Sequence, residues 1–96
     1  MSDDGGDTIN LAAVRLEIEE IDRAVIALIA QRVGVARRLG TAKRTAGLPT
    51  LDPAREAEVV RRAASLARDF GLQPEEVREV FWHIIGMCRR AQTEGA

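Results

Sequence analysis

The chain has 96 residues, enough for one compact domain, although a domain this small buries only a modest fraction of its surface. Hydrophobic residues make up 46% of the composition and charged residues 30%, which is ordinary for a globular protein. The 14 basic and 15 acidic residues nearly balance, which argues against a nucleic-acid binder, because such proteins carry a basic excess.

Three features of the sequence bear on cellular location. Cys88 is the single cysteine, so no intrachain disulfide can form, which fits a reducing compartment. The acidic, polar N-terminus has neither the basic segment nor the apolar run of a secretory signal. No stretch approaches the length of a transmembrane span. We therefore expect a cytoplasmic protein without membrane association, with a flexible tail at residues 1–8 and a helical domain at residues 9–96.

The first predicted helix is unusually long. Apolar residues recur every three or four positions from Leu11 to Leu39, and Gly47 supplies the stop signal. About 35 helical residues would span about 50 Å, whereas a compact domain of this size should be only about 30–35 Å across. The helix would therefore overhang a monomer. Its apolar stripe then needs a partner, for which a second copy of the chain is the simplest candidate.

Two shorter helices are predicted to follow. Asp52 is a suitable N-cap and Pro53 a suitable first residue for the second helix, which Gly71 ends. The third helix begins at Pro74 and its pattern fades near Gln92. The predicted buried stripes are Val59, Val60, Ala63, Leu66 and Phe70 in the second helix, and Val77, Phe81, Ile84, Ile85 and Cys88 in the third. Nothing alternates with period two over a useful length, so we predict an all-α fold.

Polar residues interrupt the apolar face of each predicted helix. Arg32 and Lys43 lie 11 residues apart, so they differ by about 20° in direction and by about 16 Å along the helix axis. Their long side chains could grip one small anion between them. Glu56 precedes the stripe of the second helix, and Cys88 and Gln92 form an i, i+4 pair on the third. Buried charges are costly unless they are paired, so this recurrence favours a ligand site.

Each of these residues also has an ordinary structural interpretation. An arginine within a stripe can extend to solvent, and a lysine near a helix C-terminus often matches the helix dipole. The ordinary roles are a solvent-exposed or ion-paired cation for Arg32, a dipole-matched cation for Lys43, a plain helix cap for Asp52, an ion-pair partner for Glu56, a small core residue for Cys88 and a fraying helix end for Gln92. Gly40 and Gly86 are expected to permit close helix packing, since each costs about 1 kcal/mol relative to alanine inside a helix.

Arg15 indicates how two chains could share a site. It lies 17 residues before Arg32, which is about 25 Å along a straight helix. A small ligand held between Arg32 and Lys43 could not also touch Arg15 of the same chain. In an antiparallel dimer of these helices, the partner's Arg15 could reach that ligand.

The ordered set of motifs resembles the all-helical chorismate mutases, a family of small intertwined homodimers that convert chorismate to prephenate. The matching segments read VRLEIEEIDRAVIALIAQR, GTAK, DPARE and IIGMCRRAQ, and the resemblance covers roughly residues 11–93. Each motif alone is weak, but their order and spacing together are specific. The resemblance implies an intertwined homodimer with shared active sites. It also implies an isomerase that carries out a [3,3] rearrangement for phenylalanine and tyrosine biosynthesis.

The resemblance also implies roles for individual residues around the carboxylates and the breaking bond. Arg32 matches the arginine that binds a substrate carboxylate, and Arg15 matches the arginine donated by the partner subunit. Lys43 matches the lysine that contacts a carboxylate and the ether oxygen. Gln92 matches the residue that donates a hydrogen bond to the same ether oxygen.

The remaining matched positions concern the rest of the substrate. Arg55 and Glu56 match the pair at the hydroxyl end, and Asp52 matches a nearby acidic position. Cys88 departs from the pattern, because some relatives place there a serine that helps to hold a carboxylate. A thiol is a weaker donor than a hydroxyl.

The implied reaction is unimolecular, so we expect neither a metal nor a cofactor. It requires a dianion held in a reactive shape and stabilisation of the charge that develops as the C–O bond breaks. Arginines suit the carboxylates because the guanidinium fork binds them with two hydrogen bonds. The expected small-molecule ligand is therefore chorismate. An association with another shikimate-pathway enzyme is left open.

Other interpretations of the sequence stay open. Isochorismate pyruvate lyase and 4-amino-4-deoxychorismate mutase share the fold and the cationic pocket, and they differ at the ring substituent. Asp52 and Glu56 favour a hydroxyl there, although a carboxylate also suits an amine. A non-catalytic helical dimerisation or regulatory module would explain the apolar stripes and the helix length. It would not explain cations and an amide at ligand-forming spacing.

Overall fold

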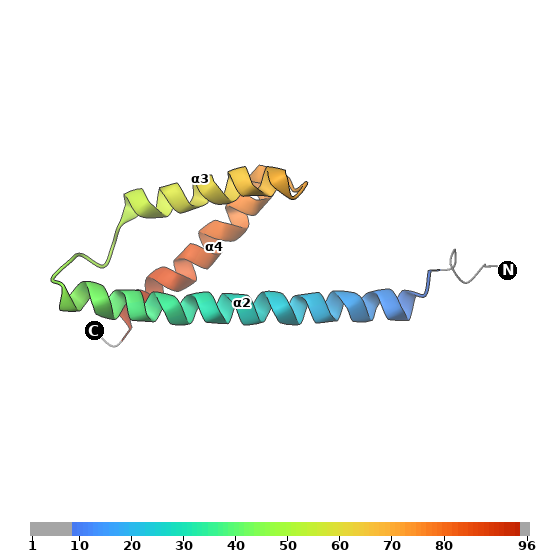
Figure 1. Cartoon of the computed structure of the whole chain (residues 1–96), viewed down its shortest axis with the longest axis horizontal. Helices are drawn as coiled ribbons and strands as arrows, with labels where there is room; N and C mark the ends of the chain where they lie inside the picture. Colours follow the sequence, from blue (N-terminus) through green and yellow to red (C-terminus); the bar gives the residue numbers. More distant parts are fainter. Residues whose placement is uncertain (1–8, 95–96) are drawn as a thin grey trace. The chain divides into compact units, whose positions relative to one another are not determined.

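A computed structural model describes residues 9–94, and these residues form three α-helices and no strand (Figure 1). Helix α2 comprises Leu11–Thr45, α3 comprises Pro53–Asp69 and α4 comprises Pro74–Thr93. The all-α prediction is therefore confirmed for the described part of the chain. The predicted tail at residues 1–8 lies outside the described residues. None of the helices described is both long and apolar enough to cross a membrane.

The predicted helix boundaries agree with the structure because the capping residues act as expected. Oδ1 of Asp52 accepts a hydrogen bond from the backbone N–H of Arg55 at 3.1 Å, and Pro53 occupies the first helical position. Gly47 and Gly71, just beyond the ends of α2 and α3, both have φ of 72°. This left-handed conformation is strained for residues with a Cβ, which explains why glycine stands at both helix ends.

The described chain divides into two units after Ala30. The part of the first unit that the structure describes contains the N-terminal half of α2, and all of its large apolar side chains except the half-buried Ile29 are exposed. They are Leu11, Val14, Leu16, Ile18, Ile21, Val25, Ile26 and Leu28. The stripe predicted for this half of the helix is thus uncovered in the single chain.

The second unit, described for residues 31–94, has a core built mainly from small residues. Helices α3 and α4 pack against each other, and Figure 1 shows α4 running from the end of α3 back to the C-terminal part of α2. The buried residues are Ala36 and Gly40 of α2, Val60, Ala63, Ala64 and Ala67 of α3, and Ile85, Cys88 and Ala91 of α4. Small side chains at these positions let the helices approach closely.

The predicted core of α3 is wrong in part. Val60 and Ala63 are buried as expected, but Leu66 and Phe70 are 53% and 72% exposed. Ala64 and the alanine at position 67 are buried in their place. The spacing of apolar residues predicted which side of α3 is apolar. It could not show that the alanines on one edge of that side are the residues that pack inward.

Gly40 marks a close approach of α2 to α4. A Cβ built at Gly40 would lie 2.2 Å from the backbone oxygen of Gln92, which no real Cβ could tolerate. The prediction that Gly40 permits close packing is therefore confirmed. At Gly86 a Cβ would meet only a terminal nitrogen of Arg90 at 3.5 Å, an ordinary contact. No close helix contact within the described residues accounts for Gly86.

This geometry predicts opposite effects for two alanine substitutions on α2. Gly40→Ala should lower the free energy of unfolding by about 1–3 kcal/mol, because the clash is with backbone and the end of α4 must move. Gly34→Ala is the matched control, since a Cβ there meets nothing within 4 Å. It should raise stability by about 0.5–1 kcal/mol through its higher helix propensity. Urea unfolding measures both effects, and equal effects at the two sites would contradict the close approach.

Candidate functional site

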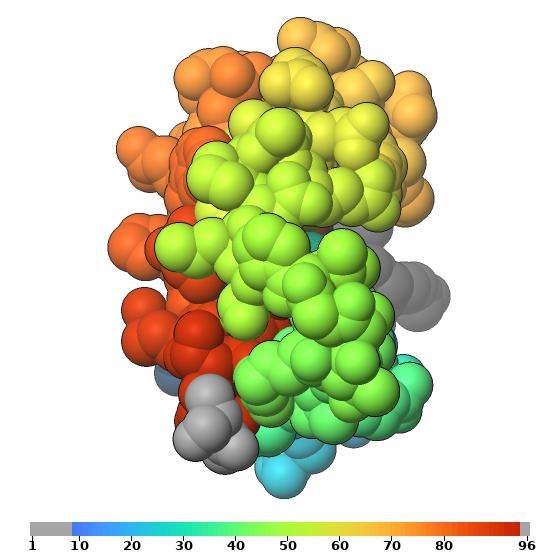
Figure 2. All heavy atoms as spheres, turned by 90° about the vertical axis from the view of Figure 1, so that its left-hand side faces the viewer, coloured from blue at the N-terminus to red at the C-terminus, as the bar shows by residue number. Residues whose placement is uncertain are grey.

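A pocket of about 320 Å³ lies within residues 31–94, among the C-terminal part of α2, the connection that follows it, α3 and α4. Figure 2 views this part from its end, with the connection and the first turns of α3 in front and the last turns of α4 beside them. The lining residues are Arg32, Val35, Ala36, Leu39, Lys43, Thr50, Asp52, Arg55, Glu56, Val59, Ile85, Cys88 and Gln92.

The pocket brings together nearly all of the predicted site residues. They come from all three helices and from the N-cap of α3, namely Arg32, Lys43, Asp52, Arg55, Glu56, Cys88 and Gln92. Arg15 is not among the lining residues, and it belongs to the unit that ends at Ala30. The structure therefore assembles the predicted site from residues far apart in sequence, apart from the arginine assigned to the partner chain.

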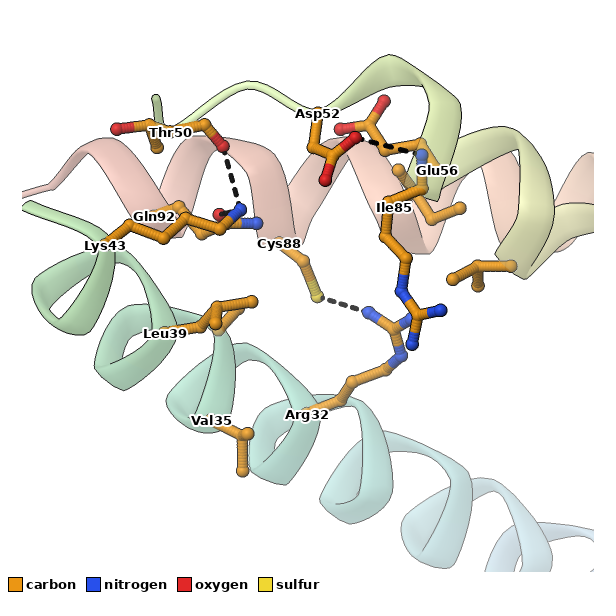
Figure 3. A pocket seen from close by; sticks show the side chains of 13 residues that line it. Arg32, Val35, Leu39, Lys43, Thr50, Asp52, Glu56, Ile85, Cys88 and Gln92 are labelled. Carbon is orange, nitrogen blue, oxygen red and sulfur yellow. Dashed lines mark hydrogen bonds between the residues drawn. The ribbon is translucent and has the colours of Figure 1, made fainter. Parts of the chain in front are cut away.

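Lys43 joins α2 to α4 at one end of the pocket (Figure 3). Its Nζ donates to Oε1 of Gln92 at 2.8 Å and to the carbonyl oxygen of Thr50 at 3.0 Å. An ammonium has three N–H groups, so one is left for a ligand. Because the Gln92 oxygen accepts from Lys43, the amide nitrogen of the same side chain is the end left to donate. This end of the pocket therefore offers two N–H donors.

The backbone of Gln92 is held as firmly as its side chain. Nη1 of Arg44 donates to the Gln92 carbonyl oxygen at 2.6 Å. About two turns earlier on α2, Nε of Arg37 donates to a carboxylate oxygen of Glu94 at 2.6 Å. Gly40 allows the helices to meet between these contacts. The alternative of a frayed helix end at Gln92 is therefore wrong, because Arg44 of α2 donates to the Gln92 carbonyl in the last turn of α4.

Arg32 and Cys88 meet at the other side of the pocket. Nη1 of Arg32 donates to Sγ of Cys88 at 2.9 Å (Figure 3), and Cys88 is only 4% exposed. A guanidinium has five N–H groups, so Arg32 keeps donors for an anion. The thiol here accepts a hydrogen bond and orients the arginine. Sequence reasoning considered Cys88 as a weak donor or as a small core residue, and not as an acceptor.

Glu56 is held from outside the pocket by Arg89 of α4. Nε of Arg89 donates to Oε2 of Glu56 at 3.0 Å, and Nη2 donates to Oε1 at 2.6 Å. The hydrogen bond to Glu56 and, second, the attraction between the two charges raise the pKa of Arg89 above its ordinary value. Arg89 does not line the pocket. Sequence reasoning missed this arginine, although a carboxylate on the inner side of α3 signals that some cation must reach it.

Asp52 and Arg55 lie at an exposed edge of the pocket. Asp52 caps α3, so its predicted cap role is confirmed, and it lines the pocket as well. The side chain of Arg55 pairs with Glu58 on the same helix while also lining the pocket. An exposed pair of this kind is weak, because water competes for both charges. Both residues are therefore available to a ligand entering at this edge.

The charges of the pocket suit a small dianion. Lining cations are Arg32, Lys43 and Arg55, whereas the lining acids are Asp52 and Glu56, and Arg89 neutralises Glu56 from behind. The excess positive charge attracts carboxylates, and the lysine and the amide can stabilise an oxygen that becomes more negative. Among the described residues, no group of three or more His, Cys, Asp and Glu side chains could hold a metal ion.

Comparison with known proteins agrees with the resemblance to chorismate mutases. The profile of the family "Chorismate mutase type II" matches residues 14–93. The chorismate mutase of Methanocaldococcus jannaschii is 31% identical over 75 residues, 78% of this chain and 76% of that protein. The 4-amino-4-deoxychorismate mutase of Streptomyces pristinaespiralis is 31% identical over 84 residues, 88% of this chain and 65% of that protein.

Some relatives are much longer. The chain spans 24%, 20% and 22% of three of them, and the last is a bifunctional chorismate mutase/prephenate dehydratase from Aquifex aeolicus. Among solved structures, a conserved hypothetical protein from Pyrococcus furiosus superimposes with a TM-score of 0.70 at 33% identity, covering 88% of this chain and 97% of that one. Since the family profile matches nearly all of the described residues, the chain belongs to the chorismate mutase type II family.

Proposed function

We propose that the protein is a chorismate mutase, an isomerase that converts chorismate to prephenate for phenylalanine and tyrosine biosynthesis. The observation that carries the proposal is the convergence of Arg32, Lys43 and Gln92 on one pocket. Family membership supplies the substrate class, and the pocket supplies the charges that this substrate class requires.

The carboxylates of the substrate would bind the cations of the pocket. The free N–H groups of Arg32 form a planar fork that matches a carboxylate, and its bond to Cys88 limits the rotation of that fork. Lys43 offers its remaining N–H to a carboxylate and to the ether oxygen. Binding of both carboxylates folds the dianion into the shape from which it rearranges. This orientation alone lowers part of the activation free energy.

The ether oxygen would lie between Lys43 and Gln92. As the C–O bond breaks, this oxygen gains negative charge, and donors fixed beforehand stabilise that charge without reorganising. Their mutual hydrogen bond of 2.8 Å fixes both donors. At the hydroxyl end, Glu56 would accept the hydrogen bond from the ring hydroxyl, with Arg55 and Asp52 nearby.

We also propose that the active protein is an intertwined homodimer with two shared sites. The uncovered apolar side chains on the N-terminal half of α2 support a helical partner. The separation of 17 residues between Arg15 and Arg32 supports donation of Arg15 by the partner, because a small ligand cannot reach both side chains along one helix. A domain of residues 9–96 would then fold together with its copy. The length of some relatives leaves open an association with a second shikimate-pathway enzyme.

A second candidate is 4-amino-4-deoxychorismate mutase, because the relative from Streptomyces pristinaespiralis bears that name. Two carboxylates at the hydroxyl end, Asp52 and Glu56, would also accept hydrogen bonds from an amine. The two activities share every step except recognition of the ring substituent. A direct comparison of substrates therefore separates them.

Product identification tests the proposed function. The purified protein should convert chorismate to prephenate, and Lys43→Ala should lose about 100-fold or more in kcat/KM, the usual loss for one charge-stabilising donor. Arg38→Ala is the matched control, because Arg38 is an exposed cation of α2 outside the pocket. Incubation with isochorismate and with 4-amino-4-deoxychorismate runs in parallel. Pyruvate with salicylate, or an amino-prephenate as the main product, would reassign the enzyme. No turnover of any of the three would favour a non-catalytic helical module.

Mixed dimers test the shared site. Arg15→Ala and Lys43→Ala chains should each be inactive alone but should regain up to about a quarter of wild-type activity when unfolded together and refolded in equal amounts. Half of the dimers are then mixed, and in each of these one of the two sites carries both substitutions and the other carries neither. A mixture that forms mixed dimers by native mass spectrometry yet stays inactive would contradict donation of Arg15.

Gln92→Glu tests the donor to the ether oxygen. At neutral pH an ionised carboxylate would repel the negative charge that develops on that oxygen, so kcat/KM should fall by about 100-fold or more. Activity should recover as pH falls, because a protonated carboxyl group can donate. The wild-type amide does not titrate, so its profile should show no such rise. The measurement is kcat/KM against pH for both proteins, with helicity followed in parallel. A flat profile for the variant would remove Gln92 from the mechanism.

A further inference from the structure

The ion pair between Arg89 and Glu56 is the feature that the proposed chemistry does not use. Both guanidinium–carboxylate hydrogen bonds cross from α4 to α3, and the Glu56 side chain is only 17% exposed against 39% for Arg89. Glu56 lines the pocket and Arg89 does not. Arg89 therefore binds the Glu56 carboxylate from outside the pocket lining.

These two hydrogen bonds leave Glu56 able to accept hydrogen bonds from a ligand in the pocket, in a fixed direction. Each carboxylate oxygen has two lone-pair sites, and the fork occupies one site on each oxygen. The second site on each oxygen stays free for a donor on the ligand. A two-point contact also restrains rotation of the carboxylate more than a single bond would.

The same contact changes what kind of donor the pocket prefers. Glu56 and Arg89 together carry no net charge, and two further cations, Arg32 and Arg55, also line the pocket. A neutral hydroxyl needs only an oriented acceptor. A protonated amine gains much of its binding from an unneutralised negative charge, and the guanidinium behind Glu56 weakens that attraction. An aliphatic amine is protonated at neutral pH.

We propose that Arg89 is a positioning residue that sets substrate specificity, by holding Glu56 as a charge-neutralised acceptor that suits a ring hydroxyl and disfavours a ring ammonium. The inference rests on the proposed chorismate mutase function. It adds that a residue outside the pocket lining, Arg89, decides between a ring hydroxyl and a ring ammonium. The two carboxylates of the lining do not decide this choice alone, since they would accept either donor.

The test replaces Arg89 by two residues that separate charge from hydrogen bonding. Arg89→Gln can still donate to Glu56 but removes the positive charge. Arg89→Lys keeps the charge but loses the planar fork. The measured quantity is the ratio of kcat/KM for chorismate to kcat/KM for 4-amino-4-deoxychorismate. Arg89→Gln should lower this ratio about tenfold or more, chiefly through KM of the amino substrate, because the attraction of an ammonium to Glu56 is no longer opposed. Arg89→Lys should keep the ratio within about threefold of wild type while lowering kcat/KM for both substrates.

Arg90→Gln is the matched control, since it removes an exposed cation one residue further along α4 without touching Glu56. It should leave the ratio unchanged. A purely structural ion pair would lower stability or activity toward both substrates by the same factor and leave the ratio unchanged in Arg89→Gln, which would overturn the inference. Wild-type activity toward chorismate is measured first. Its absence would overturn the proposed function, whereas an active wild type with an unaltered ratio in Arg89→Gln would overturn the specificity role alone.

Discussion

The hydrogen bond between Lys43 and Gln92 is the contact on which the rest of the site depends. It joins the last turns of α2 and α4, and it forms because Gly40 lets the two backbones meet. A cation turned inward is costly unless something accepts its protons. Here the acceptors are an amide oxygen and the carbonyl of Thr50, both neutral. The positive charge is therefore solvated by the protein without being cancelled.

The pocket treats its cations and its carboxylate Glu56 in opposite ways. Arg32 is bonded to a thiol, so like Lys43 it keeps its charge for a ligand. Glu56 instead receives a full counter-charge from Arg89. The pocket thus divides its charged groups into uncompensated cations, which suit carboxylates, and a compensated acceptor, which suits a neutral donor. A dianion with a hydroxyl at one end fits this division, and the apolar residues between, such as Leu39 and Ile85, favour a compact ring.

Helical register explains how far the sequence alone could predict this site. Arg32 and Lys43 share a direction because 11 residues nearly complete three turns, and the caps at Asp52 and Gly71 fix where α3 begins and ends. Those facts are local, so they can be derived from residue spacing. The contact of Arg89 with Glu56 depends on how α3 and α4 cross, which no spacing within one helix specifies.

Residue spacing within one helix does not specify contacts between elements, and this explains the other differences between prediction and structure. Leu66 and Phe70 share an apolar side of α3 with Ala63, and only the position of α4 decides which edge is covered. The carbonyl of Thr50 comes from a connection without a periodic pattern, so its role as an acceptor could not be predicted. The sequence therefore leaves undetermined which residues of different helices pair with each other. The proposed substrate specificity depends on one such pair, Arg89 with Glu56.

Uncompensated cations also link ligand binding to assembly in the proposed dimer. Arg32 and Lys43 line the pocket with like charges, and the partner's Arg15 would add another. Repulsion among them opposes closure of the shared site, whereas a dianion removes that repulsion. A ligand that binds only the assembled form stabilises it by an amount that grows with the logarithm of its concentration. The exposed apolar side chains of α2 must therefore supply the favourable free energy of association, since the charges of the empty site oppose it.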